Sequence, residues 1–132
     1  MVHRVMGASG VDVRAVRTLV SDALVKGPAW VDLGDVDLIT SEVATNARRY
    51  SASGLPGGGV WVAVLHAANR LRVEIRDDGG AETVPRIPDE TAESGRGLLI
   101  VAALTTRWGF WVGTNHKREV TVWFEVVGGT AG

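Results

Sequence analysis

The chain has 132 residues, of which 45% are hydrophobic and 22% are charged, and its formal net charge at pH 7 is −1. These values are typical of one globular domain and argue against a disordered chain. A net charge so close to zero gives no overall electrostatic attraction to nucleic acid or to an anionic membrane. The absence of cysteine excludes disulfides, thiolate metal sites and cysteine nucleophiles.

The first half of the chain predicts a short edge strand and two helices. The strand covers residues 2–6, and the first helix runs from about Val11 to Val25, with Ser9 or Asp12 as its N-cap. The second helix runs from about Asp35 to Tyr50. Its apolar positions recur every three or four residues and predict a buried stripe made of Val36, Ile39, Val43, Ala47 and Tyr50.

The second half of the chain predicts four strands and one helix. The strand around 71–77 alternates strictly between apolar and charged side chains, as in an antiparallel sheet with one covered face. In chain order we expect strands at 60–66 and 71–77, a long loop at 80–94, a helix at 95–105, and strands at 108–112 and 118–126. This order predicts an α+β fold: a single domain over residues 1–132, built as a two-layer sandwich with helices on one face of a mixed or antiparallel sheet.

Glu42 and Asn46 lie one turn apart on one face of the second predicted helix, at the edge of its apolar stripe. A carboxylate beside a carboxamide can act as a base and as a ligand for a metal ion or a phosphate group. The alternative is structural: Glu42 is solvated and pairs with Arg49, while Asn46 is an ordinary residue near the end of a helix.

Asp77 ends the alternating strand and is followed by Asp78-Gly79-Gly80. A carboxylate in this place can accept a hydrogen bond from an exocyclic amine, and the glycines let the backbone come close to a ligand. The alternative is a simple turn, because Asp-Gly pairs are common in turns.

The segment Ser94-Gly95-Arg96-Gly97-Leu98 lies where the long loop meets an apolar helix. Free backbone N–H groups at a helix N-terminus, together with the helix dipole, favour an anion such as phosphate. The alternative is that Ser94 is only a cap and that the glycines serve close packing. Taken together, the three features are the parts that a purine triphosphate with Mg²⁺ requires, with the loop at 80–94 as a lid.

The same segments resemble the small bacterial ATP-binding regulators of the anti-sigma-factor serine kinase type. These belong to the GHKL superfamily, with gyrase, Hsp90, histidine kinases and MutL. ITSEVATNARRYS is similar to the N box, RDDGG to the first glycine box and SGRGLLIVAALTTRWGF to the second, and the resemblance extends from about Val11 to Val126. It implies the Bergerat ATP-binding fold, with ATP and Mg²⁺ as cofactors. One position departs from the pattern, because Ala81 stands where the first glycine box usually ends in glycine.

The resemblance also implies a role for each site residue. Asn46 would coordinate the Mg²⁺, and Glu42 would be the catalytic residue that orients or deprotonates the attacking hydroxyl. Asp77 would bind the adenine amino group, and Gly79 would allow close approach. The remaining binding residues would be Gly95, Arg96, Gly97 and Leu98, through backbone N–H groups to the phosphates, and Thr121 at the adenine end.

The implied function is phosphorylation of a serine on a small antagonist protein, which in turn controls a sigma factor. The resemblance also implies a possible homodimer, and no direct contact with nucleic acid or a membrane. The alternatives are an ATP-binding regulatory module without phosphoryl transfer and a structural domain whose glycine segments are only loops. The first residues contain no long apolar stretch, and the longest apolar run, Leu98 to Leu104, is too short to span a bilayer, so we expect a cytoplasmic protein.

Two further sets of residues are candidates for protein contacts. Trp61, Trp111 and Trp123 could form an exposed sheet face, which would mark an interaction surface, or could belong to the core. Arg14 and Arg17 could dock an acidic partner or form a dimer face, or could simply be solvated.

Overall fold

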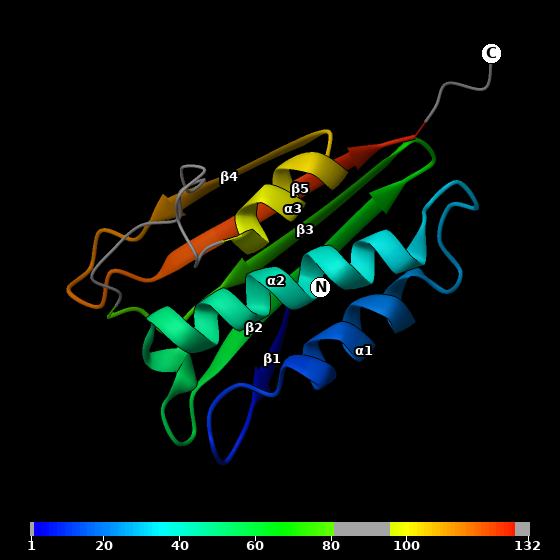
Figure 1. Cartoon of the computed structure of the whole chain (residues 1–132). Helices are drawn as coiled ribbons and strands as arrows, with labels where there is room; N and C mark the ends of the chain where they lie inside the picture. The colour runs from blue at the N-terminus through cyan, green and yellow to red at the C-terminus, as the bar shows by residue number, and fades with distance from the viewer. Residues whose placement is uncertain (1, 81–95, 129–132) are drawn as a thin grey trace.

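The computed structural model describes residues 2–80 and 96–128, which form a sheet and a layer of helices. In chain order the elements are β1 (Val2–Met6), α1 (Val13–Leu24), α2 (Leu33–Tyr50), the short 3-10 helix η1 (Ala52–Gly54), β2 (Gly59–Ala67), β3 (Arg70–Arg76), α3 (Arg96–Leu104), β4 (Arg107–Val112) and β5 (Val120–Val127). Figure 1 shows the three α-helices over one face of the sheet. The loop predicted at 80–94 lies, apart from Gly80, outside the described residues.

The five strands form one sheet in the order β1-β2-β3-β5-β4. Every neighbouring pair is antiparallel. The predicted two-layer α+β sandwich is therefore confirmed, and of the two predicted kinds of sheet, mixed or antiparallel, the structure has the antiparallel one. The strand predicted at 2–6 is also confirmed, and it lies at an edge of the sheet.

Aspartate side chains begin both long helices. Asp12 accepts a hydrogen bond from the backbone N–H of Ala15 at 3.2 Å, and Asp32 accepts one from Asp35 at 3.1 Å. Each bond satisfies an N–H group that has no partner within its helix. The cap predicted at Asp12 is confirmed. The second helix begins at Leu33, two residues before the predicted start, because Asp32 caps it.

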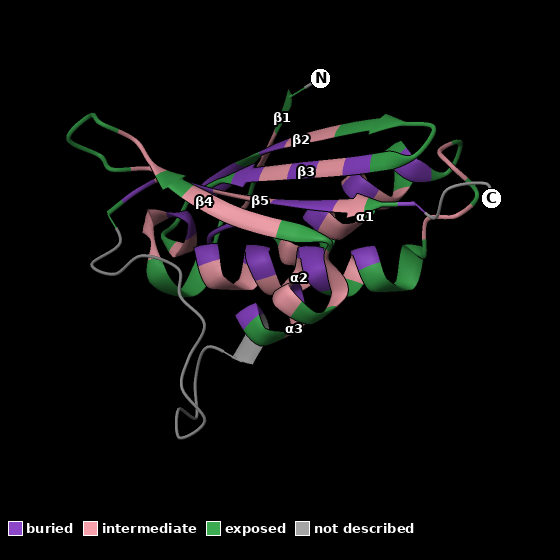
Figure 2. Cartoon of the chain, turned by 90° about the horizontal axis from the view of Figure 1, so that it is seen from above, coloured by how far each residue is buried: buried purple, intermediate pink, exposed green. Residues whose placement is uncertain are grey.

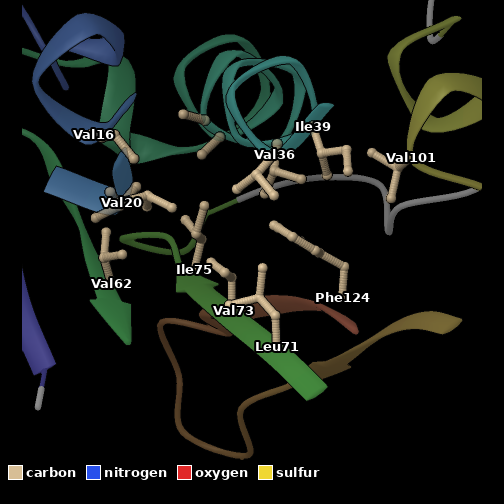
Figure 3. Packing of buried hydrophobic residues seen from close by; sticks show 14 of the residues in the cluster. Val16, Val20, Val36, Ile39, Val62, Leu71, Val73, Ile75, Val101 and Phe124 are labelled. Atoms are coloured by element: carbon tan, nitrogen blue, oxygen red, sulfur yellow. The ribbon is translucent and has the colours of Figure 1, made fainter. Parts of the chain in front are cut away.

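Apolar side chains from both layers form one core between the helices and the sheet. Figure 3 shows Leu71, Val73 and Ile75 of β3 beneath the helices, with Phe124 of β5 beside them. Figure 2 shows the buried stripes of the helices turned toward the sheet. The alternation predicted for β3 is confirmed, since its odd-numbered residues are buried and its even-numbered residues are not.

The helices cover only one face of the sheet. We call the opposite face, which carries the side chains of the alternate strand residues, the outer face. Across residues 2–80 and 96–128, no helix combines the length and apolar character that crossing a membrane demands.

Candidate functional site

Glu42 and Asn46 lie half-buried on the flank of α2 that faces away from α1. Arg17 of α1 forms an ion pair with Asp37 at 2.9 Å, which marks the opposite flank of α2. Asn46 is nine residues from Asp37, which is about two and a half helical turns, so the two side chains point to opposite sides of α2. Since α2 also packs against α3, Glu42 and Asn46 lie on the side toward α3.

Glu42 does not have the structural partner, Arg49, that the sequence suggested as an alternative. Within the described residues Glu42 forms no ion pair. Arg49 instead lies over the ring of Tyr50, with its guanidinium carbon 5.3 Å from the ring centre. A carboxylate and a carboxamide are thus presented side by side at the junction of α2 and α3.

Asp77 lies on the helix side of the sheet, because it continues the inward series of β3 beyond Ile75. The residue is 8% exposed. One oxygen, Oδ1, accepts hydrogen bonds from the backbone N–H of Gly79 at 2.8 Å and of Val120 at 2.9 Å. Burial raises the pKa of Asp77, and the two hydrogen bonds offset only part of this effect. Among the described residues no donor reaches Oδ2, which leaves one acceptor for a ligand.

Asp78 fixes the segment that follows Asp77. It accepts hydrogen bonds from both terminal nitrogens of Arg4 in β1, at 2.5 and 2.8 Å, and from the backbone N–H of Gly59 at 2.9 Å. Its own backbone N–H donates to Ser53 Oγ at 3.0 Å. Burial alone would raise the pKa of Asp78, but the bonds from Arg4 and Gly59 lower it below the usual value. Arg4 and Asp78 are 74 positions apart and no local pattern connects them, so this ion pair could not be predicted from the sequence.

Gly79 joins this segment to two neighbouring parts of the chain. Its carbonyl oxygen accepts a hydrogen bond from Ala52, just after α2, at 2.8 Å. Its φ is +81°, and a Cβ atom here would lie 2.1 Å from the carbonyl oxygen of Lys117. The structure therefore shows that the backbone at Gly79 lies close to the β4–β5 hairpin. The close contact between Gly79 and a ligand stays a prediction.

Gly79→Ala should destabilise the protein much more than Gly80→Ala. Gly80 has nearly the same φ, +80°, but no atom of residues 2–80 and 96–128 lies within 4 Å of a Cβ placed there. Both substitutions carry the cost of a left-handed backbone, about 1–2 kcal/mol, and only Gly79→Ala adds a backbone collision, roughly 1–3 kcal/mol more. Urea unfolding of the two variants measures this difference. Equal losses in the free energy of unfolding would mean that the contact with Lys117 is not close in solution.

The first turn of α3 contains the part of the predicted phosphate site that the structure describes. α3 begins at Arg96, followed by Gly97 and Leu98. N–H groups in the first turn of a helix have no partner within the helix. Leu98 is 4% exposed, so only its backbone could face a ligand, as predicted. Gly95 and Ser94 lie outside the described residues.

Thr121 does not join this site. Neighbouring residues of a strand point to opposite faces of a sheet, and Phe124 of β5 is in the core beneath the helices. Thr121 therefore lies on the outer face, where it pairs in register with Arg76 and with Trp111. This corrects the role implied for Thr121 at the adenine end. The residue of β5 that contacts Asp77 is Val120, through its backbone N–H.

The other described site segments meet at one end of the two layers. Figure 1 shows the C-terminal end of α2, the end of β3, the beginning of β5 and the first turn of α3 on the same side of the molecule. The hydrogen bond between Ala52 and Gly79 connects the end of α2 to the segment that carries Asp77. A buried acceptor, a carboxamide and a helix N-terminus here fit, in turn, the amine, the metal ion and the phosphates of a purine nucleotide.

Known proteins share the fold of this chain. The family model of the histidine kinase-like ATPase domain matches residues 8–124. The mycobacterial sensor histidine kinase MprB superposes with a TM-score of 0.57 at 17% identity, over 89% of this chain and 95% of that chain. A chain of the SiaB–SiaC complex from Pseudomonas aeruginosa gives 0.57 at 13% identity, over 96% and 89%. The histidine kinase domain of a blue-light-activated kinase from Erythrobacter litoralis gives 0.50 at 22% identity, over 88% and 65%. A comparison with curated protein sequences gives no significant match.

Proposed function

The chain belongs to the histidine kinase-like ATPase domain family, and from this premise we propose that it is an ATP-binding regulator that phosphorylates a serine on an antagonist protein and so controls a sigma factor. Membership of the family implies ATP binding, typically with Mg²⁺. The observation that carries the finer proposal is the buried Asp77, whose Oδ2 has no donor among the described residues, at the same end of the fold as the Glu42 and Asn46 flank.

Each residue of the site has a distinct task under this proposal. Asp77 Oδ2 accepts the hydrogen bond of the adenine amino group, and Asn46 offers its side-chain oxygen to the metal ion. The N–H groups around Gly97 bind the phosphate oxygens. Glu42 orients the serine hydroxyl of the partner and accepts its proton. Bound MgATP supplies the phosphoryl group and the positive charge that stabilises its transfer.

Two observations support a partner protein and a place for it. A chain of similar fold occurs in the SiaB–SiaC complex, in which two different proteins associate. Glu42 and Asn46 are only half-buried, so a hydroxyl group of another protein can reach them. The partners in question, an antagonist and a sigma factor, are cytoplasmic proteins, and we propose the same location for this chain. The homodimer implied by the resemblance remains a prediction.

Asn46→Ala should weaken MgATP binding by roughly tenfold or more, because a side-chain contact to a charged group contributes about 1.5–3 kcal/mol. Binding of ATP in the presence of a chelator should change little, since the lost contact is to the metal ion. Calorimetric titration of both nucleotide forms measures the difference. Asn69→Ala is the matched control, because Asn69 lies in the exposed β2–β3 turn. If Asn46→Ala leaves Mg²⁺-dependent binding intact, the proposed metal site is wrong.

Incubation of the wild-type protein with γ-labelled ATP and candidate antagonists distinguishes the kinase from its alternative. Label on a serine of the antagonist supports the kinase. ATP binding with no transfer to any antagonist identifies a regulatory module that holds nucleotide and a partner only.

A further inference from the structure

The outer face of the sheet carries tryptophan and arginine side chains that the nucleotide site does not use. Trp61, Arg76, Thr121 and Trp111 follow one another in register across β2, β3, β5 and β4. A groove of about 300 Å³ lies between the two tryptophans, and Glu74 and Glu119 also line it. Trp61 is 38% exposed and Trp111 is 46% exposed. The exposed tryptophan face predicted from the sequence is therefore present at these two positions.

Several side chains of this face are held in place before any ligand arrives. The guanidinium groups of Arg4 and Arg76 lie over the ring of Trp61, at 5.5 and 5.6 Å from its centre, and Arg72 lies over Trp123 at 4.4 Å. Arg76 also pairs with Glu119 at 3.4 Å. Tryptophan and arginine are enriched among the residues that dominate binding energy at interfaces, and ordered side chains lose less entropy on binding.

Positive charge accumulates at the other end of the outer face, around Glu125. Arg70, Arg72 and Arg107 approach this one carboxylate at 3.7, 2.8 and 3.0 Å. The Glu125 side chain is 9% exposed, whereas those of Arg70 and Arg107 are each 55% exposed. Arg72 also pairs with Glu74 at 2.7 Å, but two carboxylates still have fewer acceptor sites than three guanidinium groups have N–H donors, at five each. Arg70 and Arg107 therefore retain donors directed to solvent.

The charge of the outer face differs from that of the chain as a whole. Together with the β4–β5 hairpin, the outer face has seven basic side chains, namely Arg4, Arg70, Arg72, Arg76, Arg107, Lys117 and Arg118, against four carboxylates, namely Glu74, Asp78, Glu119 and Glu125. The surplus is three positive charges in a chain whose formal net charge is −1. Surfaces that associate tend to have complementary potentials, so this face suits an acidic partner.

We propose that the outer face docks an acidic segment of a partner protein, with one bulky apolar side chain in the groove between Trp61 and Trp111 and a carboxylate on Arg70 and Arg107. The two sites are four residues apart along a strand, because Trp61 and Leu65 of β2 align with Arg76 and Arg72 of β3. Four residues of strand span roughly 13 Å. An extended segment therefore fits when its apolar residue and its acidic residue are about four positions apart.

The same observations argue against two other occupants. Guanidinium groups already lie over Trp61 and Trp123, so these rings are not free to stack on bases as single-stranded nucleic acid requires. A second copy of the chain would bring one positively charged face against another, since a two-fold interface pairs the same surface with itself.

A synthetic peptide tests the proposal directly. The probe is a ten-residue peptide with one phenylalanine and two aspartates four and five positions later, titrated into ¹⁵N-labelled protein. The amide resonances that move should belong to β2, β3, β5 and β4. The double variant Arg70→Gln/Arg107→Gln should raise the Kd by about tenfold, from two exposed ion pairs of about 0.7 kcal/mol each. Arg14→Gln/Lys26→Gln removes the same charge from exposed positions of the helix layer and should leave the Kd unchanged.

Three further measurements decide the outcome. The same peptide with lysine in place of aspartate should not bind, and an oligothymidine of ten nucleotides should bind more weakly than the acidic peptide. Raising the salt concentration should weaken acidic-peptide binding to the wild-type protein. Asp77→Asn should bind the peptide normally, which separates this surface from the nucleotide site. Equal binding of the lysine peptide, tighter binding of the oligonucleotide, no movement of the named resonances, or self-association through the face in sedimentation equilibrium would each overturn the proposal.

Discussion

Asp77→Asn is expected to reduce ATP affinity about a hundredfold or more while the protein stays folded. The carboxamide oxygen of the variant can take the place of Oδ1 and still accept the N–H groups of Gly79 and Val120. Its NH₂ group then lies where Oδ2 was, so a donor faces the donating amine of adenine. A buried binding site loses much of its affinity when its hydrogen bond to the ligand cannot form, because polar groups are then left without partners. Titration calorimetry with ATP measures the loss.

The control for this variant is Glu74→Gln, because Glu74 belongs to the same strand but to the outer face. It should leave ATP affinity unchanged.

The raised pKa of Asp77 also predicts how stability and ATP binding depend on pH. Since burial raises the pKa of Asp77 in the folded state, the contribution of Asp77 to stability is greatest below its unfolded pKa and is lost as the pH rises through its folded pKa. At pH 7 Asp77→Asn should therefore unfold no more readily than the wild type. ATP binding by the wild type should weaken as the pH falls through this raised pKa. A variant that is folded and binds ATP normally would remove Asp77 from the site.

Glu42→Gln is expected to slow phosphoryl transfer to the antagonist by about 10²–10⁴-fold, the usual contribution of a general base. Glutamine keeps the size and the hydrogen-bonding ability of the side chain but cannot accept the serine proton. Because Glu42 forms no ion pair among the described residues, the substitution should not disturb a structural contact. Transfer is measured with γ-labelled ATP, and MgATP affinity in parallel.

Asp35→Asn is the matched control, because Asp35 is an exposed acid in the first turn of the same helix. It should cost only the 0.3–1 kcal/mol or so of a charge at a helix N-terminus and leave transfer unaffected. If Glu42→Gln lowers MgATP affinity and transfer in the same proportion, Glu42 acts in binding and not as the base.

Local patterns predicted the elements because each depends on near neighbours in the chain. The N-cap at Asp12 and the alternation of β3 are confirmed, and so is the buried stripe from Val36 to Ala47. Its predicted last member, Tyr50, is wrong: it is 43% exposed in the final turn of α2, where Arg49 lies over its ring. Asp77 could also be identified from the sequence as a candidate site residue, since it ends an alternating strand shortly before two glycines. Its burial and its two hydrogen bonds to Oδ1 could not be predicted, because one of them comes from Val120.

Contacts between distant segments account for what the sequence analysis missed. No local pattern connects Arg4 with Asp78, and the positive charge surplus of the outer face appears only when strand order and register are known. The error at Thr121 is different. The alternation of the strand already placed Thr121 and Phe124 on opposite faces of the sheet. The role of Thr121 was taken from the family resemblance alone.

The hydrogen bonds that hold the Asp77 segment have a consequence for the folding pathway. Arg4 and Asp78 are separated by 74 positions, and Asp77 and Val120 by 43. Contacts of such high order form late, because the loops between them must close first. The adenine end of the site should thus form in the last stages of folding. Nucleotide should therefore bind the fully folded chain and not a collapsed intermediate.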